Sequence, residues 1–363
     1  MIIEVEQYTL QRAIDKAEKI IQKSAAVILE SVLLVAQNNK ITLTSYNLVS
    51  SITIEVDGYV EENGSVLIDK SNFKLIKKLS GRLTIRDLNE VVTIKGNREL
   101  KFKQWAANEY PELNMEVNDE AFTITESEFK NSLKIKAFAS YEEARPVLAS
   151  CCIMGNRIVA LDGYKLAKID LAIDNQCKEN MMIPIQSITE LDKILDKKST
   201  RGLKFEYDIN TQSEIKYLKI TGDDYYYITR LIAGEYIKID QIIPQEFKVE
   251  IQMDKTAIKE SVEFAKEILN STKLPIKFNI TDEFKVSATS DDKEFNEVIT
   301  STMSDNTKDF RIGFDPKYLI EIFKTITDED VTLKFGSPIS PMVITGDKTK
   351  NELYLVLPIR LKE

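Results

Sequence analysis

The chain of 363 residues contains no histidine. This absence excludes Ser-His-Asp and Cys-His nucleophile systems, HExxH metalloproteases and every zinc site with a histidine ligand. Cysteine is scarce too, and Cys151, Cys152 and Cys177 form neither a CxxC pair nor a disulfide framework, which fits a reducing cytoplasm. Neighbouring residues of a strand point to opposite faces, so we expect Cys151 and Cys152 to be small, buried apolar residues.

Phosphate-binding loops are also missing. The 12 glycines are isolated, and neither GxxxxGK[ST] nor GxGxxG occurs. The acidic pairs at 223–224 and 291–292 carry the carboxylates that bind hard metal ions, but each pair falls where a turn between strands is expected. We therefore predict no catalytic residue, no metal site and no cofactor.

Basic residues are outnumbered, since 49 Lys and Arg stand against 58 Asp and Glu, for a net charge of −9. This balance argues against a protein that coats nucleic acid through overall positive charge, but it leaves room for a local basic surface. No apolar run approaches the ~20 residues of a membrane span, and the N-terminus lacks a signal pattern. We expect a cytoplasmic protein with no membrane partner.

The main pattern that is present is a repeat. Amphipathic helices are expected about every 60 residues, each set between runs with the period-2 alternation of strands. The expected helices cover 9–24, 69–80, 125–140, 184–198, 254–270 and 315–327. Strands with so few connecting helices favour antiparallel sheets backed by helices, an α+β fold.

Two such units make a domain of ordinary size, so the chain is expected to hold three domains. The predicted boundaries follow the strand-poor segments around Pro111 and Pro244. The three domains are then 1–118, 119–247 and 248–363, each with two helices packed on antiparallel sheets.

Basic residues gather on one side of the expected helices. At 100° per residue, those of the first helix fall together, opposite an apolar stripe. They are Arg12, Lys16, Lys19 and Lys23. An ordinary solvated face is the alternative, but recurrence in a chain of net −9 favours one shared positive surface facing a polyanion. The further candidates are Lys74, Lys77, Lys78, Lys134, Lys193, Lys197, Lys198, Lys259, Lys266, Lys317 and Lys324.

Two segments are apolar where a surface turn or terminus should be polar. They are 145–171 and the C-terminal run LYLVLPIRLKE, in which Pro358 interrupts an apolar strand. Two interpretations remain open here. The residues close the last sheet, or they form a groove for an apolar peptide.

Four segments carry a resemblance to a known family. They read ARPVLASCCI, LDGYKLA, RLIAGEYIKIDQIIP and LVLPIRL. In this order, and across the whole chain, they resemble the bacterial β sliding clamp, the β subunit of DNA polymerase III. The resemblance implies a head-to-tail homodimeric ring of repeated clamp domains around duplex DNA, which the protein contacts without sequence preference.

The resemblance also implies a non-catalytic processivity subunit at the replication fork. Its implied partners are the α subunit of DNA polymerase III, the clamp loader and other proteins with a QLxLF-type motif. The implied dimer contact joins Phe102 and Gln104 to Ile268 and Leu269 of the other protomer. The implied peptide pocket consists of Leu148, Leu161, Gly163, Tyr164, Lys165, Leu166, Ile237, Gln241, Ile242, Ile339, Pro341, Val356, Leu357, Pro358, Ile359, Arg360 and Leu361.

This chain departs from the family pattern at the implied sites. Leu161 replaces Thr, and Tyr164 and Lys165 replace a His-Arg pair, so we expect a less polar pocket rim. Gln104 stands where an apolar residue is usual, which predicts a weaker dimer.

Three alternatives remain open beside this interpretation. One is a clamp paralogue that acts mainly as a peptide-binding adaptor, with a weak or absent ring. The second is an enzyme that uses carboxylates and lysine. The third concerns origin, because a chromosomal clamp and a plasmid- or phage-borne relative both fit.

Overall fold

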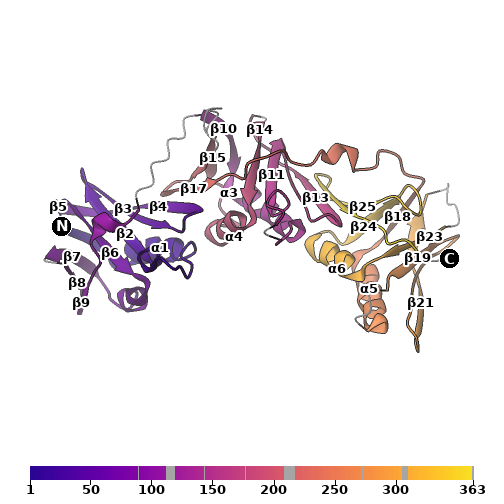
Figure 1. Cartoon of the computed structure of the whole chain (residues 1–363), viewed down its shortest axis with the longest axis horizontal. Coiled ribbons are helices and arrows are strands. Elements are labelled where there is room, and N and C mark those ends of the chain that lie inside the picture. The colour runs from indigo at the N-terminus through magenta and orange to yellow at the C-terminus, as the bar shows by residue number, and fades with distance from the viewer. Residues whose placement is uncertain are drawn as a thin grey trace. The chain divides into compact units, whose positions relative to one another are not determined.

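The structure is a computed structural model that describes residues 1–88, 90–111, 119–142, 144–175, 177–207, 217–270, 274–304 and 310–361. The chain divides into two compact units, each assembled from separate segments of the sequence. The course of the chain through its helices and strands can be followed in Figure 1. The first comprises Met1–Asn131, Ile173–Cys177 and Gln186–Ala233; the second comprises Ser132–Ala172, Lys178–Ile185 and Gly234–Glu363. The division into three domains stays a prediction, and its first boundary, at residue 118, lies outside the described residues.

The first unit contains two sheets. One has five strands in the order β5 (Gly58–Glu62), β1 (Ile2–Glu6), β7 (Arg82–Leu88), β8 (Val91–Lys95) and β9 (Glu99–Lys103). The other has eight, in the order β10 (Asp119–Thr125), β15 (Gly202–Tyr207), β16 (Tyr217–Thr221), β17 (Tyr225–Arg230), β4 (Ser50–Val56), β3 (Lys40–Tyr46), β2 (Ser31–Gln37) and β6 (Gly64–Asp69). β17 pairs with β4, so strands far apart in the sequence share one sheet.

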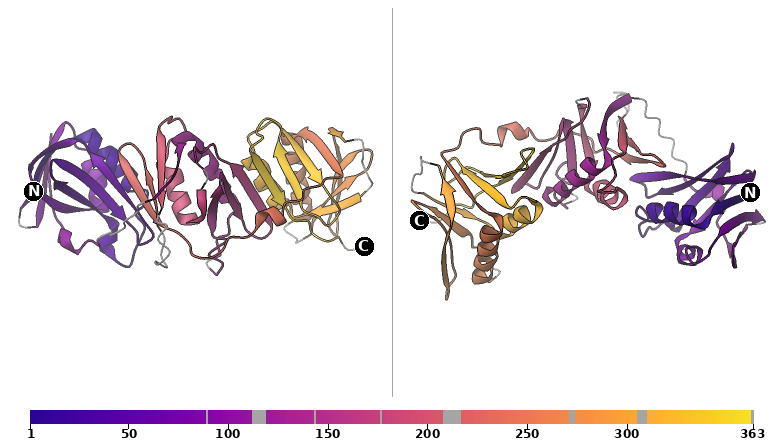
Figure 2. Two further views of the ribbon diagram at one scale, coloured as in Figure 1. Left: turned by 90° about the horizontal axis from the view of Figure 1, so that it is seen from above. Right: turned by 180° about the vertical axis from the view of Figure 1, so that it is seen from behind.

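The helices of the first unit are short. They are α1 (Gln7–Ala17), α2 (Phe73–Ile76), α3 (Glu126–Ser132) and α4 (Ile185–Ile194), with 3₁₀ turns η1 (Val27–Glu30), η2 (Lys70–Asn72) and η3 (Ala107–Glu109). The indigo helix α1 packs against β3 and β4 (Figure 2). It does so through Leu10, Ala13, Ile14 and Ala17, all of which are buried.

The second unit also contains two sheets. The larger has nine strands in the order β14 (Cys177–Pro184), β11 (Ser150–Gly155), β12 (Arg157–Leu161), β13 (Lys165–Asp170), β26 (Glu352–Val356), β25 (Met342–Gly346), β24 (Asp330–Phe335), β18 (Val249–Asp254) and β22 (Ser301–Met303). The smaller has four, in the order β21 (Glu294–Ile299), β20 (Phe284–Thr289), β19 (Ile276–Ile280) and β23 (Phe310–Phe314). Helices α5 (Lys255–Leu269) and α6 (Pro316–Thr325) pack against each other (Figure 1), and the 3₁₀ turns are η4 (Leu133–Phe138) and η5 (Ile239–Gln241).

The α+β prediction is confirmed. The strand pairs with a defined register are antiparallel, for example β13 with β26 and β18 with β24. All six expected helical regions contain helix, although most end earlier than expected. Cys151 and Cys152 lie on β11 and are buried, as predicted. No helix in the described part of the chain is long and apolar enough to cross a membrane.

Local capping explains where the best-predicted helices begin. The side chain of Asp254 accepts a hydrogen bond from the Ala257 N–H, and that of Asp315 accepts one from the Lys317 N–H. Carboxylates at this position satisfy amides that have no partner within the helix. α1, by contrast, begins at Gln7 rather than at the expected Thr9, and no side chain caps it.

Candidate functional site

The implied peptide pocket lies on the second unit, around the end of β26. Lys165 pairs with Val356 across β13 and β26, and the Leu357 N–H donates to the Tyr164 carbonyl at 2.8 Å. Two residues on, the Ile359 N–H donates to the Gly313 carbonyl of β23 at 2.8 Å. The backbone therefore joins the predicted segments 161–166 and 356–359.

The turn between β12 and β13 is held by a carboxylate that the sequence interpretation missed. Asp162 Oδ1 accepts hydrogen bonds from the N–H groups of Tyr164, at 2.8 Å, and Lys165, at 3.0 Å. Gly163 has φ of +95°, a conformation that other residues rarely adopt. Burial raises the pKa of Asp162, against the effect of the two amide hydrogen bonds. The pattern Asp-Gly before a strand was the available signal.

Lys165 does not form the pocket rim that we expected. Its side chain is 4% exposed and forms an ion pair with Glu321 of α6. Its Nζ also donates to the Ala137 carbonyl at 2.5 Å and lies 5.1 Å from the centre of the Phe138 ring. The lysine therefore connects β13, η4 and α6 inside the protein, and its charge is compensated there.

Tyr164 has an aromatic partner that the sequence interpretation also missed. Its ring is 57% exposed and stacks on Tyr318 of α6, with centroids 5.5 Å apart and planes at 12°. Burial, together with the nearby carboxylates of Asp162 and Asp315, raises the pKa of Tyr318 to about 12. Helical periodicity places Tyr318 in the first turn of α6, but only the fold brings Tyr164 to it.

The other pocket residues fall into two groups. Leu161, Leu166 and Val356 are at most 5% exposed, so their side chains belong to the core and support the surface from within. The remaining members, like Gly163 and Tyr164, keep accessible surface; they are Leu148, Ile237, Gln241, Ile242, Ile339, Pro341, Leu357, Pro358, Ile359, Arg360 and Leu361.

Two of the outlying pocket segments have defined anchors. Gln241 ends η5, whose Asp240 accepts paired hydrogen bonds from Arg157 of β12 at 2.9 and 2.7 Å. Pro341 precedes Met342, which pairs with Val356 at the end of β26. Both segments are thus attached to the nine-stranded sheet that carries the C-terminal residues.

The basic surface of the first unit differs from the expected helix face. α1 ends at Ala17, so Lys19 and Lys23 follow the helix instead of extending its face. Arg12 and Lys16 both contact Asp224, at 3.6 and 2.5 Å. Asp224 lies in the predicted turn before β17, and its carboxylate compensates part of the charge of Arg12 and Lys16.

The other predicted cations of the first unit differ in whether they form an ion pair. Lys77 pairs with Asp15 at 2.8 Å and with Glu18 at 2.7 Å, which compensates its charge. The other predicted lysines are exposed and form no ion pair within the described residues. They are Lys19, Lys23, Lys74, Lys78, Lys193, Lys197 and Lys198.

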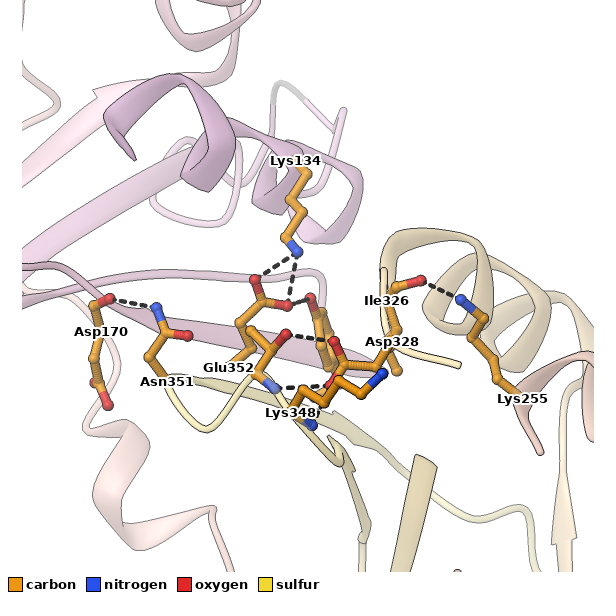
Figure 3. A network of polar contacts seen from close by, with 10 residues as sticks. Lys134, Asp170, Lys255, Ile326, Asp328, Lys348, Asn351 and Glu352 are labelled. Atoms are coloured by element: carbon orange, nitrogen blue, oxygen red, sulfur yellow. Dashed lines mark hydrogen bonds and ion pairs between the residues drawn. The ribbon is translucent and has the colours of Figure 1, made fainter. Parts of the chain in front are cut away.

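Lys134, in the second unit, is part of an internal network (Figure 3). Its Nζ donates to Glu352 Oε2 at 2.7 Å, and the Tyr354 hydroxyl donates to the same carboxylate at 2.6 Å. Glu352 is 8% exposed. Lys134 is therefore a structural cation, and we withdraw it from the predicted basic surface because its charge is already neutralised.

The remaining predicted cations of the second unit lie on α5 and α6. Lys259 and Lys324 come within 3.8 and 3.9 Å of Glu263. Lys266 and Lys317 are exposed, without an ion pair in the part of the chain that the structure describes.

The implied dimer residues are not equally available. Phe102 lies on β9, an edge strand, and Ile268 near the end of α5; both are partly exposed. Leu269 is only 2% exposed, so it belongs to the core of its own protomer. Gln104 accepts from the Leu67 N–H at 2.6 Å and donates to Asp87 Oδ1 at 2.9 Å, so its amide is satisfied within the chain.

Comparisons with known proteins agree with this fold. Residues 1–116 match the N-terminal domain, and residues 240–360 the C-terminal domain, of the DNA polymerase III beta subunit family. The chain is 25% identical over 318 residues to the beta sliding clamp of Bacillus subtilis, covering 83% of this chain and 82% of that protein. It is 25% identical over 351 residues to the beta sliding clamp of Streptococcus pneumoniae R6, covering 91% and 89%.

Solved structures share the fold over nearly the whole chain. The beta subunit from DNA polymerase of Streptococcus pyogenes has a TM-score of 0.88 at 23% identity, covering 99% of this chain and 100% of that one. The DNA polymerase III subunit beta from Pseudomonas aeruginosa has a TM-score of 0.90 at 18% identity, with the same coverage. With both terminal domains matched and relatives aligned over most of its length, the chain belongs to the DNA polymerase III β subunit family, the β sliding clamps, as a divergent member.

Proposed function

We propose that this chain works as a DNA sliding clamp, a ring-shaped head-to-tail homodimer that encircles duplex DNA and tethers the replicative polymerase for processive synthesis. The observation that carries the proposal is the match to both terminal domains of the family, together with the clamp fold over 99% of the chain. The function needs no reaction at a catalytic site. Its place is the cytoplasm, at the replication fork.

DNA contact is proposed to run through those predicted lysines that are exposed and form no ion pair within the described residues. Phosphate contacts of this kind position a duplex without reading its bases, and weak contacts allow sliding. In the first unit these are Lys19, Lys23, Lys74, Lys78, Lys193, Lys197 and Lys198, and in the second Lys266 and Lys317. Arg12, Lys16 and Lys77 contribute less, because neighbouring carboxylates compensate part of their charge.

Retention on DNA tests encirclement directly. The protein is loaded with a clamp loader onto a nicked circular plasmid and separated by gel filtration, and the plasmid is then cut with a restriction enzyme. A ring stays on the circle and is lost from the linear form. Equal retention on both forms would contradict the proposal, and peptide binding without retention on circles would instead support the adaptor alternative.

The dimer is proposed to join the β9 edge of one protomer to the end of α5 of the other. Phe102 and Ile268 supply partly exposed apolar surface for this contact. Ile268→Asp should shift sedimentation from dimer to folded monomer. Leu269→Ala is the contrasting variant, and it should lower protomer stability by about 2–5 kcal/mol because it opens a cavity in a packed core. A dimeric Ile268→Asp protein would exclude this interface.

The partner site is proposed to be the apolar surface around Leu357, Pro358 and Ile359, which receives QLxLF-type peptides. The DNA polymerase III α subunit and the clamp loader are the expected owners of such peptides. Burial of one Leu and one Phe contributes about 3–6 kcal/mol in total, part of which is lost in ordering the peptide. An isolated peptide should therefore bind with a Kd from roughly micromolar to hundreds of micromolar.

Leu357 offers a clean test because its side chain is 37% exposed. Leu357→Ala should weaken binding of a labelled peptide by at least about fivefold, measured by fluorescence anisotropy. Val298→Ala, at an apolar side chain that is 48% exposed on β21, is the matched control and should leave affinity unchanged. Equal affinity of wild type and Leu357→Ala would overturn the assigned site.

A further inference from the structure

The four-stranded sheet of the second unit carries a cavity of about 550 Å³ on its polar face. Helix α5 packs against β19, β20 and β21 on the other face, where Phe278 and Val286 are buried. Side chains alternate between the two faces of a strand, so the polar residues of β19 and β20 lie on the cavity side. Among the described residues that line the cavity, only Phe310 is apolar. Apolar ligands favour hydrophobic pockets, so this lining fits a charged or strongly polar ligand.

Three cations from neighbouring strands line this cavity. They are Lys277 of β19, Lys285 of β20 and Arg311 of β23. Asn279 pairs with Lys285 on one side and with Arg311 on the other, so these three residues form one row across the sheet. Lys277 lies two residues before Asn279 on the same face. Because adjacent strands are about 4.8 Å apart, the long side chains of all three cations can reach one anion above Asn279.

The charge in the cavity is positive at its centre and negative at its ends. All three cations keep accessible surface, and none of them forms an ion pair with another described residue. Two exposed carboxylates also line the cavity, and they belong to Glu283 and Glu294. Glu283 precedes the first residue of β20, whereas Glu294 pairs with Thr289, the last residue of β20. A compact anion between the cations therefore avoids both carboxylates.

A neutral donor lies at the centre of the cavity. Asn279 Nδ2 donates to the Ser287 hydroxyl at 2.8 Å, and Ser287 is only 8% exposed. This contact holds the amide in the row between Lys285 and Arg311 and leaves its second N–H for a ligand. Asn279 thus adds a neutral hydrogen-bond donor to the three charged ones.

We propose that this cavity binds an oligophosphate, that is, a chain of two or three phosphate groups, either free or as part of a nucleotide. The Arg311 guanidinium can donate two parallel hydrogen bonds to phosphate oxygens, and the two lysines supply point charges. An acidic peptide, the alternative polyanion, is extended and would pass Glu283 or Glu294, where like charges repel it. An oligophosphate is short enough to stay between these two carboxylates.

Isothermal titration calorimetry with the full-length protein tests the site at low ionic strength, where surface charges are least screened. The probes are tripolyphosphate, ATP, adenosine and a hexa-aspartate peptide. We expect tripolyphosphate and ATP to bind and adenosine not to bind. Equal affinities of tripolyphosphate and ATP would mean that the phosphate chain alone is recognised, and tighter binding of ATP would mean that the ligand is a nucleotide. Tighter binding of hexa-aspartate than of tripolyphosphate, or binding of adenosine, would overturn the proposal.

Variants locate the binding on this face of the sheet. Arg311→Gln and Lys285→Gln should each weaken tripolyphosphate binding by about five- to tenfold, because each removes a charged donor. Lys348→Gln removes the same charge from a side chain that is 76% exposed in the turn before β26, and it should leave the affinity unchanged. Glu283→Gln removes a repelling carboxylate and should tighten binding, which no loss of folding can imitate. Equal affinities of wild type, Arg311→Gln and Lys285→Gln, or no binding to the wild type, would overturn the site.

Discussion

Replacement of Glu190 is predicted to destabilise the first unit strongly. Glu190 lies on α4 and is 2% exposed, and its carboxylate is surrounded by neutral hydrogen-bond donors. The donors come from α4 itself, β4, β17, the turn after β3 and the segment after α1. They are Gln186, Ser50, Tyr227, Asn47 and Gln22. The Glu190 side chain therefore connects residues of the segment 1–116, which matches the N-terminal domain of the family, with residues of the segment between the two matched domains.

The expected loss can be worked out from these contacts. Glu190→Leu leaves buried donors such as Tyr227 OH without their partner, and each costs about 1–3 kcal/mol. Removal of a buried carboxylate recovers some of its desolvation cost, which offsets part of the loss. The net decrease in the free energy of unfolding should be about 3–5 kcal/mol. Glu190→Gln should cost about 1 kcal/mol, because its oxygen still accepts and the Ser50 and Tyr227 hydroxyls can accept from the amide.

Urea denaturation at pH 7, followed by circular dichroism, gives the free energy and its dependence on urea for each variant. Hydrogen exchange adds local information, since the Val49 and Ser50 amides donate to Asn47 Oδ1, and Asn47 in turn donates to Glu190. These two amides should lose protection in Glu190→Leu and keep it in Glu190→Gln. A Glu190→Leu protein within 0.5 kcal/mol of wild type would refute the reasoning, because the donors would then have found other acceptors.

Three further predictions concern single polar contacts. Gln104→Leu should lower stability by about 1–3 kcal/mol in thermal denaturation and should not tighten the dimer in sedimentation, because the Leu67 N–H loses its acceptor; a tighter, equally stable dimer would contradict this. Lys134→Met should lower the free energy of unfolding by about 1–3 kcal/mol, and Glu352→Gln should partly restore it. The control Lys266→Met, at an exposed position, should change this free energy by less than about 0.5 kcal/mol. Equal effects of the two lysine replacements would show that the ion pair of Lys134 with Glu352 does not stabilise the fold. Burial alone would raise the pKa of Asp328, but hydrogen bonds from the Thr349 side chain and the Thr349 and Lys348 amides lower it below its ordinary value. The stabilisation by this carboxylate should therefore be present above about pH 4 and be lost as the pH falls through the lowered pKa. Wild type and Asp328→Asn should differ in urea stability at pH 7 and converge in acid, and a difference that stays constant with pH would exclude this linkage.

The sequence by itself determined the α+β class, the positions of the helices and much of the strand pattern. Periodicity is a local property, because side chains repeat every 3.6 residues in a helix and every two in a strand. Caps are local as well, so Asp254 and Asp315 marked their helices correctly. The family resemblance, confirmed by the comparisons, also indicated which segments form the proposed sites.

Tertiary structure alone decided what each polar or apolar side chain does at those sites. Lys16 meets Asp224 across 208 residues of sequence, and Lys134 meets Glu352 across 218. A cation on a helix face looks the same in the sequence whether it faces solvent or an internal carboxylate, because its partner comes from a distant strand. For the same reason, the stacking of Tyr164 on Tyr318 and the burial of Leu269 depended on how the chain packs, and local pattern carries no information about such long-range neighbours.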